Sequence, residues 1–188
     1  MNEPGARGPH TLRLFFALWP GAAERKSLAA STADAVSQVD GQLVPAANLH
    51  VTLAFLGSVP GRRFVDLTGV GGQGNYPAVA MRFDRLEYWA KPRVLVAMPV
   101  EIPAAGREIV DRLWERLALL GFERESRPWR PHLTLARKVR RPPPENLRLA
   151  PGIGASDDPA PWGLALVEST THPEGARYKP LAEWPLGN

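Results

Sequence analysis

Residues 48–57, NLHVTLAFLG, form the stretch that most constrains the fold, because they predict a β-strand with two polar side chains on one face. Successive side chains of a strand point to opposite sides of a sheet, so His50 and Thr52 share one face. We expect the strand to stop at Gly57. The side chains expected to point the other way, into a core, are Val51, Leu53 and Phe55. The polar pair is therefore directed at something other than the interior.

Residues 132–135 repeat this pattern as His-Leu-Thr-Leu. By the same alternation His132 and Thr134 share a face, while the two leucines point to the opposite side. The chain has four histidines, and the other two, His10 and His172, lie beside the N-terminal tail and in a Thr-His-Pro turn. Repetition of the polar pair suggests one site in which one imidazole donates a proton and the other accepts one.

Transfer at phosphorus is the chemistry that suits two such pairs. One histidine would take a proton from an attacking oxygen and the other would give a proton to a departing oxygen, which contributes about 10²–10⁴-fold in rate. Threonine hydroxyls would hydrogen-bond the phosphoryl oxygens. We expect no cofactor and no metal, since two histidines without cysteine or a neighbouring carboxylate would leave a zinc coordination sphere incomplete.

Arg130 is expected on the same face as His132, and the matching position of the first motif is Asn48. A guanidinium on one side would stabilise negative charge on a phosphate. The same cation would favour the neutral form of His132. We therefore predict that His132 is the proton acceptor and His50 the proton donor, although a bound phosphate would act in the opposite direction.

The charge of the chain comes mainly from arginine. The 188 residues carry a net charge of +4, and only four of the 23 basic residues are lysines. For the whole chain, two explanations are equally good: attraction to phosphate, and a genomic base composition that favours arginine codons. Around the second motif, however, the basic residues favour an anion site, with only Glu123 and Glu125 against them. They are Arg124, Arg127, Arg130, Arg137, Lys138, Arg140 and Arg141.

Composition also excludes several classes of protein. The chain has no cysteine, which excludes disulfides and thiolate chemistry and is compatible with a reducing cytoplasm. No apolar run approaches the roughly 20 residues that a membrane span needs. The apolar run at residues 12–19 is interrupted by Arg13 and is better interpreted as a strand than as part of a signal peptide. We expect a cytoplasmic protein without a membrane partner, and a monomer.

Periodicity and turn residues predict an α+β fold. We expect two pseudo-symmetric lobes, each a mainly antiparallel sheet backed by helices, around a central cleft. Residues 1–11 would be a disordered N-terminus and residues 12–188 a single two-lobed domain, with an irregular loop at 141–161. The expected helices are at 21–39, 62–69 and 103–120. The expected strands, besides those of the two motifs, are at 12–19, 78–88, 93–100, 162–171 and 176–182.

The chain resembles the two-histidine (2H) phosphoesterases. The resemblance is carried by both His-x-Thr-Leu motifs, by Arg130-Pro131-His132, and by the segments at 13–17, 48–57 and 177–181. Within that superfamily the chain is most similar to the bacterial RNA 2′,3′-cyclic phosphodiesterases, also called 2′-5′ RNA ligases.

This resemblance implies hydrolysis of a terminal RNA 2′,3′-cyclic phosphate to a 2′-phosphate. His50 would protonate the departing 3′ oxygen and His132 would activate water. The residues implied to hold the phosphate are Thr52, Thr134 and Arg130. Phe15 and Tyr178 are implied, less specifically, to approach the nucleotide.

Two alternatives remain open from the sequence. Reversible joining of RNA ends through a 2′-5′ linkage would use the same acid and base. A non-catalytic module that binds nucleotides or RNA would not need a proton relay, so the presence of both histidines and both threonines argues against it. The expected partners are RNA ends with a 2′,3′-cyclic phosphate, or nucleotides.

Overall fold

The computed structural model describes residues 11–99, 101–149, 153, 162–172 and 175–187, and this part contains three α-helices and eight strands. The helices are α1 (Ala22–Ser37), α2 (Phe64–Gly72) and α3 (Ala104–Leu119), with two short 3₁₀ turns, η1 (Ala46–Asn48) and η2 (Gly61–Arg63). The strands are β1 (Thr11–Trp19), β2 (Gln42–Leu43), β3 (Val51–Pro60), β4 (Arg85–Trp89), β5 (Val94–Met98), β6 (Leu133–Arg137), β7 (Gly163–His172) and β8 (Gly175–Trp184).

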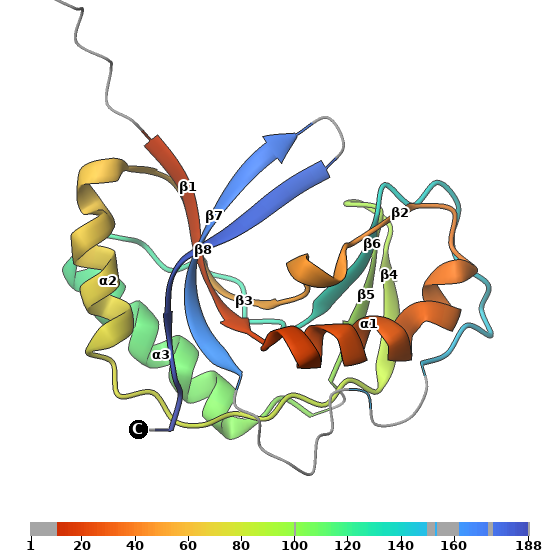
Figure 1. Ribbon diagram of the computed structural model, residues 1–188, viewed down its shortest axis with the longest axis horizontal. Helices are drawn as coiled ribbons and strands as arrows, with labels where there is room; N and C mark the ends of the chain where they lie inside the picture. The colour runs from red at the N-terminus through yellow and green to blue at the C-terminus, as the bar shows by residue number, and fades with distance from the viewer. Residues whose placement is uncertain (1–10, 100, 150–152, 154–161, 173–174, 188) are drawn as a thin grey trace, which may run out of the picture.

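One antiparallel sheet runs through the molecule in the order β4-β5-β6-β3-β1-β7-β8, with β2 paired to β6. The two motif strands are neighbours at its centre, where Val51 of β3 pairs with Leu133 of β6. We call β3, β1, β7 and β8 the β1 lobe, and β4, β5, β6 and β2 the β5 lobe (Figure 1). The expected α+β class with a mainly antiparallel sheet is confirmed, and the sheets of the two lobes are joined.

Helices α1 and α3 each pack on the lobe that does not contain the motif strand following them in the chain. Helix α1 packs beside β6 and η1, whereas α3 packs on β3, and α2 contacts α3, β7 and β8 (Figure 1). The helix that leads into β3 therefore covers the β5 lobe, and the helix that leads into β6 covers the β1 lobe. Each motif strand is thus backed by the helix that precedes the other one.

Strand β1 is buried on both faces. Leu14, Phe16 and Leu18 belong to the main core, while Phe15 and Trp19 form a second buried cluster with residues of β7 and with Tyr178. A strand covered on both sides has an almost continuous apolar sequence, which explains the run at residues 12–19. Helix α3 supplies Ile109, Leu113 and Leu117 to the main core, as its helical spacing predicts.

Most element boundaries agree with the sequence, and the exceptions lie at turns. The strand expected at 78–88 is shorter and begins only at Arg85, and it forms an antiparallel hairpin with β5. Helix α2 runs from Phe64 to Gly72, so it ends three residues later than expected. Strand β1 starts at Thr11, the last residue of the expected tail. Residues 1–10, 150–152 and 154–161 lie outside the described residues, and 141–149 contain no helix or strand.

The expectation that Gly57 ends the first motif strand is wrong. Strand β3 continues to Pro60, and Gly57 adopts a φ of +70° within it. Leu14 pairs with Gly57 and Phe15 with Phe55, so Leu56 is an extra residue and forms a β-bulge. Glycine allows the positive φ of such a bulge without steric cost, so it bends the strand instead of stopping it.

None of the helices in the described part of the chain combines the length and the apolar character that crossing a membrane requires.

Two glycines of α2 give a matched test of its packing. A Cβ added at Gly71 would overlap the indole ring of Trp184, whereas one added at Gly69 would meet nothing within 4 Å. We expect Gly71→Ala to lower the free energy of unfolding by about 1–3 kcal/mol through overpacking. Gly69→Ala should raise it by up to about 1 kcal/mol through helix propensity. Urea unfolding measures both, and equal effects would contradict the packing described here.

Candidate active site

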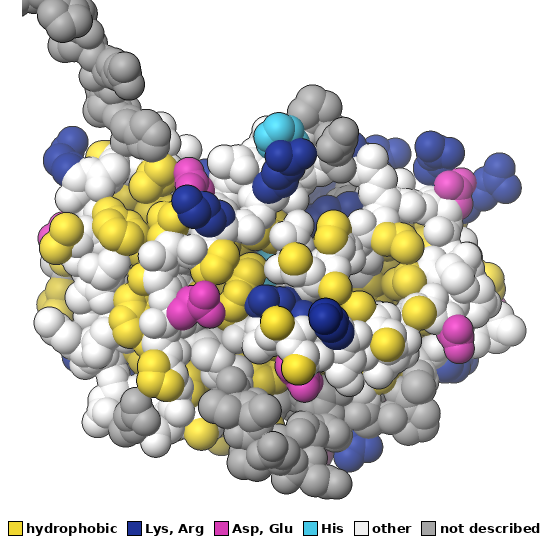
Figure 2. Space-filling view, viewed as in Figure 1, with side chains coloured by type: hydrophobic (Ala, Val, Ile, Leu, Met, Phe, Trp, Pro, Cys, Tyr) yellow, Lys and Arg dark blue, Asp and Glu magenta, His cyan; other side chains and the backbone are white. Residues whose placement is uncertain are grey.

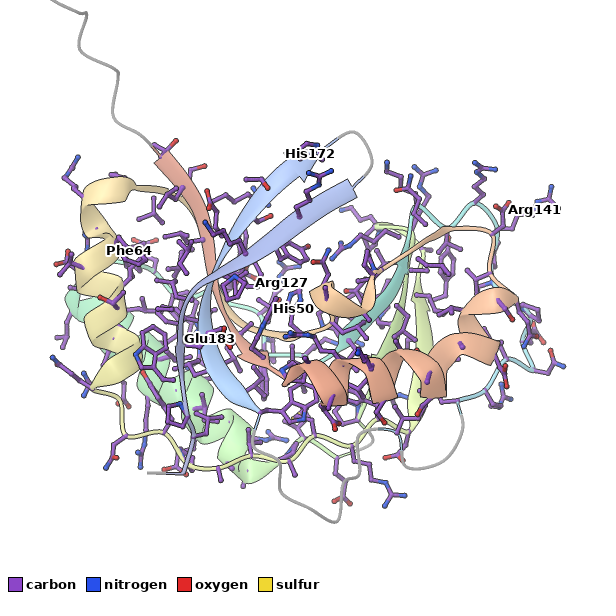
Figure 3. All side chains as sticks on the ribbon, viewed as in Figure 1. His50, Phe64, Arg127, Arg141, His172 and Glu183 are labelled. Carbon is purple, nitrogen blue, oxygen red and sulfur yellow. The ribbon has the colours of Figure 1, made fainter. Side chains whose placement is uncertain are left out.

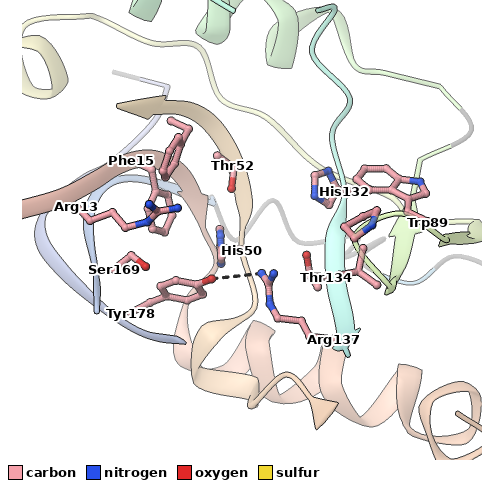
Figure 4. A pocket seen from close by; sticks show the side chains of 13 residues that line it. Arg13, Phe15, His50, Thr52, Trp89, His132, Thr134, Arg137, Ser169 and Tyr178 are labelled. Atoms are coloured by element: carbon pink, nitrogen blue, oxygen red, sulfur yellow. Dashed lines mark hydrogen bonds between the residues drawn. The ribbon is translucent and has the colours of Figure 1, made fainter. Parts of the chain in front are cut away.

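Both polar pairs line one cavity between the two lobes, as the repeated motif predicts. The cavity has a volume of about 280 Å³, and His50, Thr52, His132 and Thr134 all contribute to its wall. Figure 4 shows the first pair on β3 facing the second pair on β6. The other lining residues are Arg13, Phe15, Phe55, Trp89, Pro92, Val94, Arg137, Ser169 and Tyr178. Two segments far apart in the sequence thus present the same functional groups to one space.

Each histidine is oriented by a hydrogen bond to the backbone two residues earlier. Nδ1 of His50 lies 2.7 Å from the carbonyl oxygen of Asn48, and Nδ1 of His132 lies 2.7 Å from that of Arg130. A carbonyl oxygen can only accept, so Nδ1 carries the hydrogen in both rings. Nε2 is then the free nitrogen of each ring. A neutral ring offers a lone pair there and a protonated ring offers a proton, so each imidazole can act as base or acid.

Aromatic rings hold the two imidazoles in place. The ring centroid of His132 lies 4.6 Å from that of Trp89 on β4. His50 is enclosed more fully, with centroids 5.0 Å from Phe15, 5.7 Å from Trp19 and 5.0 Å from Tyr178. The buried cluster of β1 therefore serves as a wall for the first histidine.

A second β-bulge lies inside the first motif. Thr52 pairs with Ala17 and Ala54 pairs with Phe16, so Leu53 is an extra residue opposite β1. A bulge shifts the alternation by one position. Leu53 and Ala54 are consequently both buried in the main core.

The same bulge occurs at the same position of the second motif. Thr134 pairs with Val96 and Ala136 pairs with Leu95, so Leu135 is the extra residue opposite β5. Leu135 and Ala136 are both buried in the main core. The structural repeat is therefore one residue longer than the four-residue motif, and it includes the alanine that follows each leucine.

These bulges turn the next residue of each motif toward the cavity. Phe55 was expected in the core, but it is 38% exposed and lines the cavity instead. Arg137 occupies the matching position after the second motif, and simple alternation from Thr134 would have placed it on the opposite face. Arg137 was expected only as one of the basic residues around the second motif, and not as a residue of the site itself. The repeated alanine was the only available signal that the two positions correspond.

The structure does not bring Arg130 into this cavity. Its Nη2 donates a hydrogen bond to Oε2 of Glu87 at 2.9 Å, and its guanidinium lies over Trp89 at 5.0 Å. Trp89 in turn donates its indole N–H to the same carboxylate oxygen at 2.9 Å. Arg130 therefore contacts the wall behind His132, while its carbonyl orients that histidine.

Positive charge in the cavity comes instead from Arg13 and Arg137. Arg137 donates a hydrogen bond from Nη2 to the hydroxyl of Tyr178 at 3.3 Å, across the cavity from β6 to β8 (Figure 4). Arg13 lies over the ring of Phe55 at 4.6 Å. The lining contains no carboxylate among the described residues. On the face shown in Figure 2, Lys and Arg side chains lie at several separate places.

Burial controls the ionisation of both histidines. It lowers the pKa of His50 to about 4, and repulsion from Arg137 and His132 acts in the same direction. Burial also lowers the pKa of His132, with repulsion from Arg137 and Arg130 adding to it. Both rings are therefore neutral at pH 7 in the free protein. Arg130 alone was expected to distinguish the two histidines, but burial and Arg137 lower the pKa of both.

Among the described residues, no group of three or more histidine, aspartate or glutamate side chains is arranged to hold a metal ion.

Fold and cavity together have the arrangement expected of a two-histidine phosphoesterase. Residues 24–165 match the 2′-5′ RNA ligase superfamily. The chain is 30% identical to the RNA 2′,3′-cyclic phosphodiesterase of Escherichia coli (strain K12) over 183 residues, which cover 93% of this chain and 96% of the relative. The chain belongs to the 2′-5′ RNA ligase superfamily.

Solved structures agree with this assignment. The Escherichia coli protein LigT complexed with 3′-AMP matches with a TM-score of 0.74 and 28% identity, over 95% of this chain and all of that one. The protein TT0787 of Thermus thermophilus matches with a TM-score of 0.74 and 27% identity, over 94% of this chain and all of that one.

Two arginine variants test the electrostatics of the site. Arg137→Gln should raise the pKa of both His50 and His132, because it removes a positive charge that acts on each ring. Arg130→Gln should raise the pKa of His132 alone. NMR titration of the imidazole Cε1 protons measures both values. A response of only one ring to Arg137→Gln would show that this arginine does not lie between them.

Proposed function

We propose that the protein hydrolyses the terminal 2′,3′-cyclic phosphate of RNA to a 2′-phosphomonoester. The observation that carries this proposal is the presence of two imidazoles and two threonine hydroxyls around one cationic cavity. The Escherichia coli relative, similar over nearly its whole length, bears the name RNA 2′,3′-cyclic phosphodiesterase. Those groups are what an in-line displacement at phosphorus requires.

In the proposed reaction, neutral His132 accepts a proton at Nε2 from a water molecule as its oxygen bonds to phosphorus. Protonated His50 donates its Nε2 proton to the 3′ oxygen as the bond between phosphorus and that oxygen breaks. The phosphoryl group stays on the 2′ oxygen. Thr52 and Thr134, which flank the histidines in the cavity wall, donate hydrogen bonds to the phosphoryl oxygens. Proton exchange with solvent then returns both rings to their starting state.

Substrate binding favours the protonation of His50 by solvent. With a pKa of about 4, His50 is neutral in the free protein at pH 7. A phosphodiester anion beside the ring favours the charged form and so raises the pKa of His50. Proton uptake is thus coupled to binding of the anion. The same anion also raises the pKa of His132, so the assignment of His50 as donor and His132 as acceptor rests on the resemblance to the two-histidine phosphoesterases and not on these pKa shifts.

Two arginines can contribute charge to the phosphate from different positions. Arg137 lies in the cavity and is the one we propose to contact the phosphoryl oxygens. The assignment of Arg130 to phosphate binding stays a prediction, and this residue would have to leave Glu87 to make such a contact.

The same groups can also join RNA ends, and by microscopic reversibility they catalyse the cleavage of the linkage they form. A 5′-hydroxyl in place of water would give a 2′-5′ linkage at the expense of the cyclic phosphate. His132 would again accept the proton of the attacking oxygen, and His50 would again donate one to the departing oxygen. The chain belongs to a superfamily named 2′-5′ RNA ligase, which supports this second activity as an alternative.

We further propose that the protein acts as a cytoplasmic monomer. Both histidines, both threonines and the two cavity arginines belong to one chain, so a second copy is not needed to complete the site. The lack of cysteine suits a reducing compartment.

Histidine variants test the proposed chemistry. His50→Ala and His132→Ala should each lower kcat for an RNA oligomer ending in a 2′,3′-cyclic phosphate by at least about 10²-fold, because each removes one proton-transfer group. The reaction is measured with a chelator present, and the phosphate position of the product is identified. The matched control is His172→Ala, which removes an exposed histidine at the end of β7, away from His50 (Figure 3).

Three results would contradict this proposal. They are a 3′-phosphate product, turnover that depends on added metal, and activity that survives both histidine substitutions. Tight nucleotide binding without turnover by the unaltered protein would instead support the non-catalytic alternative.

A further inference from the structure

A second and larger hollow adjoins the catalytic cavity. It has a volume of about 540 Å³ and lies between β3, α3 and the segment that leads to His132. The residues that line both spaces are Thr52, Phe55, Trp89, Pro92 and His132. We call this hollow the tryptophan groove, because Trp114 and Trp129 line it beyond the shared residues. The groove therefore lies next to the catalytic cavity, where Thr52 and His132 form part of both walls.

The walls of the groove are aromatic and rigid. Trp129 donates its indole N–H to the carbonyl oxygen of Thr52 at 2.9 Å, which fixes the ring against the strand that bears the first motif. The other edge of that ring lies close to Gly106 of α3, where an added Cβ would be 3.1 Å from it. Trp114 is 8% exposed and is held in the main core. Fixed aromatic faces of this kind stack nucleic acid bases with little sequence preference.

Arginines stand at the edge of the same groove. Arg124 and Arg127 line it, and their side chains are 46% and 83% exposed. Each is paired with a carboxylate, Arg124 with Asp111 at 2.7 Å and Arg127 at 3.0 Å with Glu125, which also lines the groove. Exposed ion pairs contribute little to stability, so a phosphodiester can replace the carboxylate partner at small cost. The groove thus offers stacking surfaces inside and guanidinium groups at its edge.

We propose that the tryptophan groove binds the nucleotide on the 5′ side of the reacting one. This inference rests on the proposed function. The terminal nucleotide of a hydrolysed RNA end has one covalent neighbour, which lies on its 5′ side, so RNA that extends beyond the catalytic cavity must place that nucleotide next. Its base stacks among the aromatic side chains, and its phosphate lies at Arg124 and Arg127. The preferred substrate is accordingly an oligonucleotide and not a mononucleotide.

The test compares two substrates that have the same reacting nucleotide, one with and one without further nucleotides on its 5′ side. The substrates are adenosine 2′,3′-cyclic phosphate and a trinucleotide that ends in the same cyclic adenosine. For the unaltered protein we expect kcat/KM to be at least about 10-fold higher for the trinucleotide, mainly through a lower KM. In the double variant Arg124→Glu/Arg127→Glu, the ratio of the two kcat/KM values should fall by at least about 10-fold, because the edge of the groove then repels phosphate.

A matched double variant, Arg62→Glu/Arg82→Glu, makes the same change in net charge at exposed arginines that line neither hollow. It should leave the ratio unchanged. Equal kcat/KM for the two substrates in the unaltered protein would overturn the inference and leave the proposed function intact. An equal fall of the ratio in both double variants would also overturn it, by showing a general effect of charge. If neither substrate is hydrolysed, the proposed function fails and this inference fails with it.

Discussion

The hydrogen bond from Nδ1 of each histidine to a backbone carbonyl two residues earlier is the interaction on which the site depends. It fixes the tautomer and the orientation of the ring together, and so leaves Nε2 for the cavity. The two accepting carbonyls, of Asn48 and Arg130, lie just before the motif strands. These strands meet at the pair of Val51 and Leu133, where the two lobes join. The point of contact between the lobes therefore also sets the positions of the two rings relative to one another.

The matching β-bulges explain why a nearly symmetric pair of motifs forms an asymmetric site. Each bulge buries two consecutive residues and turns the next one to the cavity, Phe55 in one strand and Arg137 in the other. The first motif strand thus contributes an apolar ring to the cavity and the second a cation. Arg137 then adds to burial in lowering the pKa of both histidines, so both rings are neutral at pH 7 in the free protein.

Strand alternation, read from the sequence, predicts the facing of the residues that precede each bulge. It does not predict the facing of the residues that follow the bulge. His50, Thr52 and their counterparts line one cavity, because strict alternation holds over those three positions. Phe55 and Arg137 were misplaced or missed, because a bulge depends on the partner strand and not on residue types in the motif itself. The helices illustrate the same limit. Their positions follow from periodicity, but which lobe each one covers is decided by tertiary packing.

Phosphate binding tests most directly whether both histidines serve one phosphorus atom. NMR titration of the free protein with adenosine 2′-monophosphate, the product form of the proposed reaction, follows the Cε1 protons of His50 and His132 in one experiment. One bound equivalent should raise the pKa of both rings, and both signals should follow the same binding curve. A response of only one histidine, or two separate binding curves, would contradict a shared catalytic centre.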